Sequence, residues 1–168
     1  MSDLEQEVLA QLAQEGVSYR ELRVNYAFHS AQMAPLAAEL VAALGSFTPG
    51  VASIPLYSTV TGQASDGRDL DADYWGRNMR QTVRFADAVR SAAHDGLALF
   101  VELSPHPVLA GVAGECLAAA GLPPAAFASL RRQRPERESL LQTLADLYTA
   151  GCNPNWEALY PTPAAHVP

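Results

Sequence analysis

The chain has 168 residues, of which 49% are hydrophobic and 17% charged, and this length and composition are typical of one folded globular domain. Its formal net charge of −7 argues against a nucleic-acid partner, because phosphate binding needs a concentrated basic surface. The start of the chain is acidic and no apolar run is long enough to cross a bilayer, so we expect no signal peptide, no membrane partner and a cytoplasmic protein.

The first predicted helix covers residues 2–15. Ser2 and Glu5 form a capping box at its start, and Gly16 suits the position just after a last helical turn. Residues 17–24 are then predicted as a strand.

Helices and strands alternate through the rest of the chain. Residues 97–103 are nearly all apolar, which is the pattern of a strand covered on both faces. The alternation predicts an α/β architecture with a parallel sheet. Pro123-Pro124 marks the best candidate boundary, and residues 161–168 are typical of an extended linker. In chain order, these further elements are expected at residues 32–44 (helix), 54–60 (strand), 71–79 and 85–94 (helices), 97–103 (strand), 108–120 (helix), 127–130 (strand) and 136–150 (helix).

Two features of the composition favour structural roles. Cys116 and Cys152 are far apart and have no metal-ligand spacing, so we expect reduced thiols and no metal site. The basic cluster is expected to form a solvated face at a helix start. It consists of Arg131, Arg132, Arg134 and Arg137.

Residues 24–30, Val-Asn-Tyr-Ala-Phe-His-Ser, predict a short strand that ends at His29. Histidine suits a catalytic base because its pKa lies near physiological pH. Such a base usually serves a Ser or Cys nucleophile, yet the Gly-x-Ser-x-Gly motif that best houses this nucleophile is absent from the sequence. Ser30 is a poor candidate, because neighbouring strand residues point to opposite faces. The alternative is a histidine that simply packs at a strand end.

Four segments in the same order resemble the acyltransferase domains of modular type I polyketide synthases. Residues 24–30 resemble the signature around the catalytic histidine of that family. Residues 73–89 resemble its Tyr-Trp-x-x-Asn-x-Arg-x-x-Val-x-Phe block, and residues 100–109 its Phe-x-Glu-x-(Gly/Ser)-Pro-His-Pro-Val-Leu block. Residues 129–132 and Trp156 resemble the linker that follows the domain. The resemblance covers nearly the whole chain but only the C-terminal half of the family's domain.

The resemblance implies a fold and a division of the chain. The expected fold class is α/β, the C-terminal part of an α/β-hydrolase-like acyltransferase body with the end of a ferredoxin-like lobe. Residues 1–24 would end that lobe, residues 25–125 would belong to the body, and residues 126–168 would form the post-acyltransferase linker.

The resemblance also implies roles for individual residues. His29 would deprotonate the nucleophile and then protonate the departing thiol of coenzyme A. A carbonyl of Asn78 would orient His29, the alternative being an ordinary asparagine on a helix surface. Tyr26, Ala27 and Phe28 would line the substrate pocket, although an aromatic pair of this kind is often plain core. The family's nucleophilic serine, its carboxylate-binding arginine and its oxyanion-hole donors all lie upstream of the matched region.

The expected substrate is malonyl-CoA or methylmalonyl-CoA, with no bound cofactor. In the family, His-Ala-Phe-His accompanies malonyl use and Tyr-Ala-Ser-His methylmalonyl use, and this chain combines Tyr26 of the second pattern with Phe28 of the first. The bulk of Phe28 favours malonyl, because it would crowd a methyl group on the malonyl C2.

The expected function is transfer of this unit to an acyl carrier protein. The other partners would be a ketosynthase domain and the upstream half of the acyltransferase domain. Alone, the chain is expected to be inactive. The rival interpretation is a non-catalytic docking or linker fragment that contacts the ketosynthase or the carrier protein. We expect structural roles for two other histidines. His106 would lie in a fixed turn before a helix that starts at Pro107, and His94 would lie at a helix C-terminus.

Overall fold

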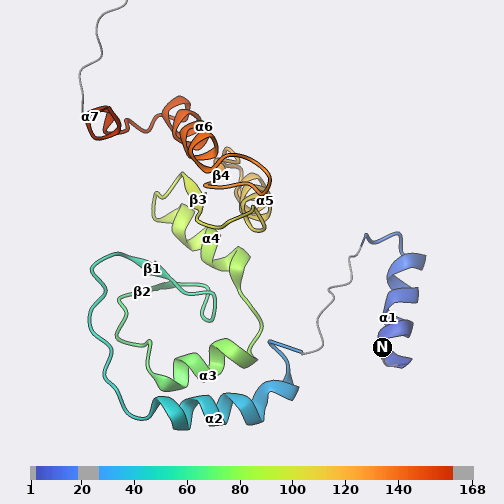
Figure 1. The fold of residues 1–168 in the computed structure, drawn as a ribbon. Coiled ribbons are helices and arrows are strands. Elements are labelled where there is room, and N and C mark those ends of the chain that lie inside the picture. The colour runs from blue at the N-terminus through green and yellow to red at the C-terminus, as the bar shows by residue number, and fades with distance from the viewer. Residues whose placement is uncertain (1–2, 19–26, 161–168) are drawn as a thin grey trace, which may run out of the picture.

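The computed structural model describes residues 3–18 and 27–160, which form a mixed arrangement of helices and short strands (Figure 1). The helices are α1 (Asp3–Gln14), the single 3₁₀ turn η1 (Ala31–Met33), α2 (Ala34–Leu44), α3 (Ala72–Arg80), α4 (Phe85–His94), α5 (Ala110–Ala119), α6 (Glu136–Thr149) and α7 (Trp156–Leu159). The strands are β1 (Leu56–Tyr57), β2 (Ala64–Ser65), β3 (Phe100–Glu102) and β4 (Ala126–Ala128).

Helix α1 confirms the first predicted helix. Gly16 follows it with a φ of +68°, and the N–H of Val17 donates back to the carbonyl of Leu12 at 2.9 Å, which closes the helix end. The predicted cap at Ser2 lies outside the described residues, as does most of the predicted strand 17–24, whose first two residues are not in a strand. Helix α1 packs against none of the other described elements (Figure 1).

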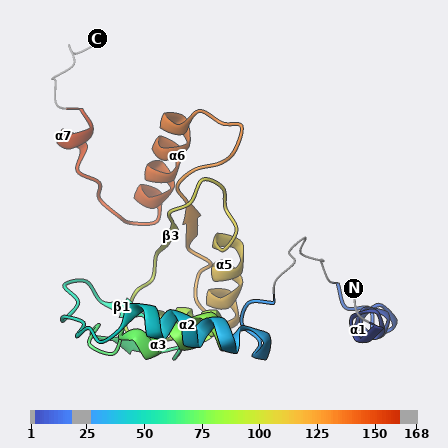
Figure 2. The same ribbon diagram turned by 60° about the horizontal axis from the view of Figure 1, so that its bottom comes forward.

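Helices α2 and α3 lie side by side and form one layer of the molecule (Figures 1 and 2). Gly76 of α3 allows the close approach, since a Cβ at this position would lie 2.6 Å from Cγ2 of Val41 in α2. Helix α2 ends at Gly45, as predicted, where φ is +61°. In this layer, α2 comes shortly after His29 in the chain, with only η1 between them.

Strands β1 and β2 form a small antiparallel hairpin, where the sequence predicted one strand of a parallel sheet over residues 54–60. The chain turns back because the hydroxyl of Ser58 accepts hydrogen bonds from the N–H groups of Val60 and Thr61, at 3.1 and 3.2 Å. Gly62 then takes a φ of +75° and donates to the carbonyl of Ser58 at 2.7 Å. The predicted strand is therefore shortened to two residues.

Strands β3 and β4 pair in parallel, with α5 as the crossover between them, which confirms a parallel βαβ unit (Figure 2). The register places Phe100 opposite Ala126 and Glu102 opposite Ala128. A small core lies where α4 and α5 meet this pair, and Leu117, at 1% exposure, is at its centre. The pairing joins residues on both sides of Pro123-Pro124.

The apolar run of residues 97–103 predicted a strand covered on both faces, but β3 is not covered on both faces. It is three residues long, Val101 is exposed, and Leu103 just beyond it is 85% exposed. In the described part of the chain, the neighbouring elements do not bury all the apolar side chains of residues 97–103.

Helix α6 packs on β4 through Thr143, whose hydroxyl donates to the carbonyl of Ala128 at 2.7 Å. The sequence did not predict α7, whose Trp156 meets Tyr148 of α6 edge to face with ring centroids 5.5 Å apart. Among the described helices, none is both long and apolar enough to span a membrane.

Candidate active site

His29 lies in a tight turn, residues 27–30, rather than at a strand end. Ser30 closes the turn: its hydroxyl donates to the carbonyl of Ala27 at 2.7 Å and accepts from the N–H of Gln32 at 3.2 Å. His29 itself has a φ of +60°, an uncommon conformation for a residue with a side chain and one that gathers at functional sites. The hydroxyl of Ser30 is occupied in capping η1, which supports the prediction that it is a poor nucleophile.

The C-terminal end of α3 holds His29 in place through two backbone carbonyls. The N–H of His29 donates to the carbonyl of Met79 at 3.1 Å, and its Nδ1 lies 3.0 Å from the carbonyl oxygen of Gln81. A carbonyl can only accept, so this contact requires the proton on Nδ1 and leaves the lone pair on Nε2. Nε2 makes no hydrogen bond within the described residues, and the side chain is exposed. In the neutral form of this ring, Nε2 is therefore the nitrogen that can take a proton.

Among the described residues, no hydrogen bond joins Asn78 to His29, and the carbonyl beside Nδ1 of His29 is that of Gln81. The reason is the end of α3 at Arg80, because the carbonyls left without an intrahelical donor are those of the last turn. Asn78 lies inside the helix and is half-buried. Sequence reasoning missed Gln81 because a backbone carbonyl carries no side-chain signal.

The residues of the Tyr-Trp block fix α3 and thereby the two carbonyls. Asp71 caps the helix by accepting from the N–H of Tyr74 at 2.8 Å. Tyr74 is buried, and its hydroxyl is hydrogen-bonded to that of Ser58 at 2.9 Å. Trp75 donates from Nε1 to the carbonyl of Leu70 at 3.1 Å. These aromatic residues act on His29 through the helix, not by direct contact.

Of the three residues predicted to line the pocket, Tyr26 lies outside the described residues. Ala27 is half-buried and Phe28 is 51% exposed. The ring of Phe28 is tilted by 47° against the imidazole of His29, with centroids 6.2 Å apart. The rings of Phe28 and His29 are therefore neighbours on this turn.

Glu102 has a role that the sequence analysis did not identify. Its carboxylate accepts from the N–H groups of Val108, Leu109 and Ala110, at 2.7 to 3.1 Å, and from the hydroxyl of Ser104 at 2.9 Å. Desolvation raises the pKa of Glu102, but these hydrogen bonds outweigh it and lower the pKa below its usual range.

The segment around His106 is a fixed turn, as predicted. The hydroxyl of Ser104 also lies 2.8 Å from the carbonyl of His106, so this carbonyl and the carboxylate of Glu102 share its one proton. The following helix begins at Ala110, however, so Pro107 is not its first residue. Glu102 reaches across this turn to the start of α5.

No group of three or more His, Cys, Asp or Glu side chains in the described ranges is arranged to hold a metal ion. Among the predicted site residues that the structure describes, His29 is the one whose hydrogen bonds suggest a chemical role.

Comparisons with known proteins agree on one family. The sequence profile described as acyl transferase domain matches residues 2–154. The spectinabilin polyketide synthase system protein NorA' of Streptomyces orinoci is 43% identical over 155 residues, which are 92% of this chain and 4% of that protein.

Solved structures extend this likeness to the fold. The acyltransferase domain from module 8 of the salinomycin polyketide synthase superimposes with a TM-score of 0.85 at 41% identity, covering 90% of this chain and 36% of that one. The acyltransferase domain of SpnD in complex with 2-(pent-4-yn-1-yl)malonyl has a TM-score of 0.74 at 27% identity, covering 87% of this chain and 36% of that one. The chain thus spans little more than a third of the solved domains that it matches.

Proposed function

The chain belongs to the acyltransferase domains of modular polyketide synthases, and we propose that His29 is the general base of their acyl transfer. The observation that carries this proposal is the contact between Nδ1 of His29 and the carbonyl of Gln81, because it fixes the tautomer with a free lone pair on Nε2.

In the proposed reaction, a serine hydroxyl attacks the thioester carbonyl of the acyl-CoA while Nε2 of His29 takes its proton. The imidazolium then returns this proton to the departing thiolate of coenzyme A, leaving an acyl-serine ester. The thiol of an acyl carrier protein then attacks the acyl-serine ester while Nε2 of His29 takes the thiol proton. The acyl group moves to the carrier sulfur, and His29 returns the proton to the serine oxygen.

The proposed acyl unit is malonyl or methylmalonyl. The malonyl derivative bound to the similar SpnD domain supports a malonyl-type substrate. The position of Phe28 beside the imidazole favours the smaller malonyl unit, because a C2 methyl group would compete with the ring for space.

The proposed architecture follows the family. Residues 25–125 would form part of an α/β-hydrolase-like body, and the parallel pairing of β3 with β4 would join the start of the linker to it. Helix α1 would belong to a ferredoxin-like lobe. The lack of contact between α1 and the other described elements agrees with such a separate position. A ketosynthase domain, a carrier protein and the rest of the acyltransferase domain are the proposed partners.

A docking or linker role without chemistry is the second candidate. The exposed aromatic pair Tyr148 and Trp156, on the segment that resembles the family's linker, favours it. The two functions make opposite predictions for His29, since a docking segment has no use for its imidazole.

A chimeric domain tests the proposal. This chain replaces the matching region of the salinomycin module 8 acyltransferase domain, and transfer from malonyl-CoA to a carrier protein is measured. His29→Ala should lower transfer by at least about 10²–10⁴-fold while the melting curve is unchanged. His106→Ala is the matched control and should leave transfer near normal. Near-normal transfer by the His29 variant would overturn the catalytic proposal and favour docking.

A further inference from the structure

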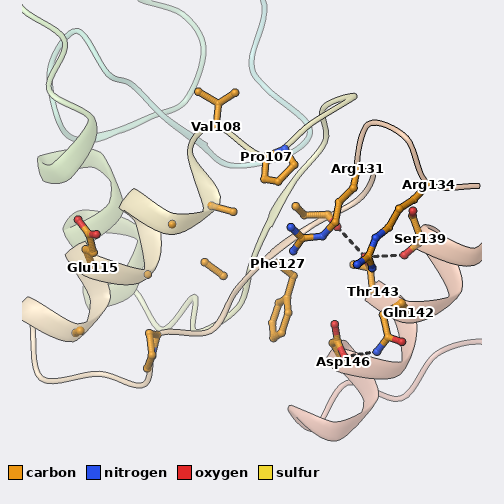
Figure 3. A pocket seen from close by; sticks show the side chains of 17 residues that line it. Pro107, Val108, Glu115, Phe127, Arg131, Arg134, Ser139, Gln142, Thr143 and Asp146 are labelled. Carbon is orange, nitrogen blue, oxygen red and sulfur yellow. Dashed lines mark hydrogen bonds between the residues drawn. The ribbon is translucent and has the colours of Figure 1, made fainter. Parts of the chain in front are cut away.

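A cleft of about 920 Å³ lies between α5, β4 and α6, away from His29 (Figure 3). Pro107 and Val108 line one side, and Arg131, Arg134 and Thr143 line the other. The arginines come from the loop before α6, whose two ends are tied by a hydrogen bond from the N–H of Arg134 to the carbonyl of Arg131 at 3.3 Å.

The cleft contains two arginines that form no ion pair within the described chain. Neither Arg131 nor Arg134 forms an ion pair with a described residue, although both side chains reach into the same cleft (Figure 3). Two guanidinium groups in one cleft repel each other unless an anion lies between them. Arg132 and Arg137, the other members of the basic cluster, do not line it.

Acidic side chains also line the cleft, but they do not pair with the arginines. Glu115 is on the opposite wall, on α5 (Figure 3). Asp146 is two turns along α6 from Ser139, and it accepts from Nε2 of Gln142 at 2.8 Å. Glu136 and Glu138, in the first turn of α6, do not line the cleft, so the arginine side of its lining is the more positive one.

The start of α6 adds donors on this side. The 14-residue helix follows Pro135, has no side-chain cap and so leaves N–H groups of its first turn open. Ser139, next to this turn and 8% exposed, lines the cleft, and its hydroxyl has no hydrogen-bond partner among the residues that the structure describes. A buried hydroxyl without a partner is unusual in a folded protein and calls for an explanation.

We propose that this cleft binds a phosphate group, held by Arg131 and Arg134 at the start of α6. A phosphate fits because its several oxygens can accept from two planar guanidinium groups and from helix N–H groups at once. Phosphates occur on coenzyme A, on the phosphopantetheine arm of a carrier protein and free in solution. The use of coenzyme A as a probe rests on the proposed function, whereas binding of inorganic phosphate is independent of it.

The test is a calorimetric titration of the whole chain with four probes: inorganic phosphate, coenzyme A, pantetheine and acetate. Phosphate and coenzyme A should bind, and their affinities should fall as salt is added. Pantetheine, which has no phosphate, and acetate should bind at least about tenfold more weakly. Tighter binding of coenzyme A than of phosphate would identify the larger ligand, and equal binding would identify the phosphate group alone as the ligand. Equal binding of acetate or pantetheine, or no binding of phosphate, would overturn the proposal.

Two double variants with the same change in net charge separate the site from the general field of the protein. Arg131→Gln with Arg134→Gln should weaken phosphate binding at least about tenfold, because two charge-assisted contacts are lost. Arg132→Gln with Arg137→Gln should weaken it less than about twofold, because these arginines lie outside the cleft. An equal loss in both variants would overturn the proposal, and circular dichroism checks that each variant is folded. Arg131→Lys with Arg134→Lys keeps the charge and should restore part of the affinity.

Discussion

Phe28 directly precedes His29, and its half-exposed ring lies against the imidazole. In the chimeric acyltransferase domain, Phe28→Ser should raise the use of methylmalonyl relative to malonyl by about tenfold, because steric exclusion of one methyl group contributes only about 1–3 kcal/mol. A competition assay with equal concentrations of both CoA esters measures the ratio. An unchanged ratio would mean that Phe28 does not face the substrate.

Glu102 links the end of β3 to the start of α5 through its carboxylate. The lowered pKa of Glu102 means that its contribution to stability is complete above the pKa of the unfolded chain and is lost as the pH falls through the lower, folded-state pKa. Glu102→Gln should therefore lower the melting temperature near pH 7 by several degrees, since an amide oxygen replaces only part of a carboxylate that accepts four donors. As the pH falls from about 4 to about 2, where carboxyl groups become protonated, the difference in melting temperature between this variant and the unaltered chain should shrink.

Thermal melts across this pH range check the effect of Glu102. Glu115→Gln, on the exposed surface of α5, removes an equal charge and serves as the control. A difference in melting temperature that does not change with pH would contradict the role of the carboxylate.

The sequence names candidate side chains for the site, but it does not indicate which backbone carbonyls lie beside them. The sequence identified His29 because histidine in that setting resembles a known signature. It predicted that a carbonyl of Asn78 orients His29, and it gave no sign of the Gln81 carbonyl that lies beside Nδ1. Which carbonyl is free depends on where α3 ends, and helix ends are set by packing and hydrogen bonds that a residue pattern does not specify.

At the scale of the elements, Gly76 determines how closely α3 approaches α2. Gly76→Ala should destabilise the protein by about 1–3 kcal/mol, because the new methyl group would overlap the stiff, β-branched side chain of Val41. Gly111→Ala is the matched control in α5, where a Cβ meets nothing within 4 Å, and it should stabilise by about 0.5–1 kcal/mol as alanine favours helix. Urea unfolding of both variants measures the two changes. Equal effects would mean that helix propensity, not contact with Val41, dominates.

Helices were predicted more accurately than strands. The predicted helix 85–94 coincides with α4, because an apolar stripe at helical spacing is a local signal. The predicted strand 54–60 became two residues of a hairpin, because the hydroxyl of Ser58 forms the turn. A serine hydroxyl can serve a strand, a turn or solvent equally well, so the sequence pattern alone could not reveal this choice.

At the scale of the whole molecule, the proposed chemistry needs a nucleophile for which the sequence offers no Gly-x-Ser-x-Gly motif. We expect the chain by itself not to form a covalent acyl-enzyme, since loss of a nucleophile leaves at most weak residual catalysis. Incubation with labelled malonyl-CoA, followed by denaturation and mass measurement, checks this. Stoichiometric label on a serine or threonine of this chain would contradict the expectation.

The exposed apolar residues at the end of β3 predict how the chain behaves in solution. Val101, Leu103 and Val108 are all exposed close together in sequence, and in the described chain β3 pairs on one edge only, with β4. Exposed apolar surface beside an open strand edge promotes association, so we expect oligomers that grow with protein concentration. Leu103→Lys should shift light-scattering masses toward the monomer, because a lysine opposes pairing at an edge. Ile54→Lys changes a residue that is 77% exposed but lies in the loop before β1, so it should leave the masses unchanged. A monodisperse monomer for the unaltered chain, or an equal effect of both variants, would show that the end of β3 is not an association surface.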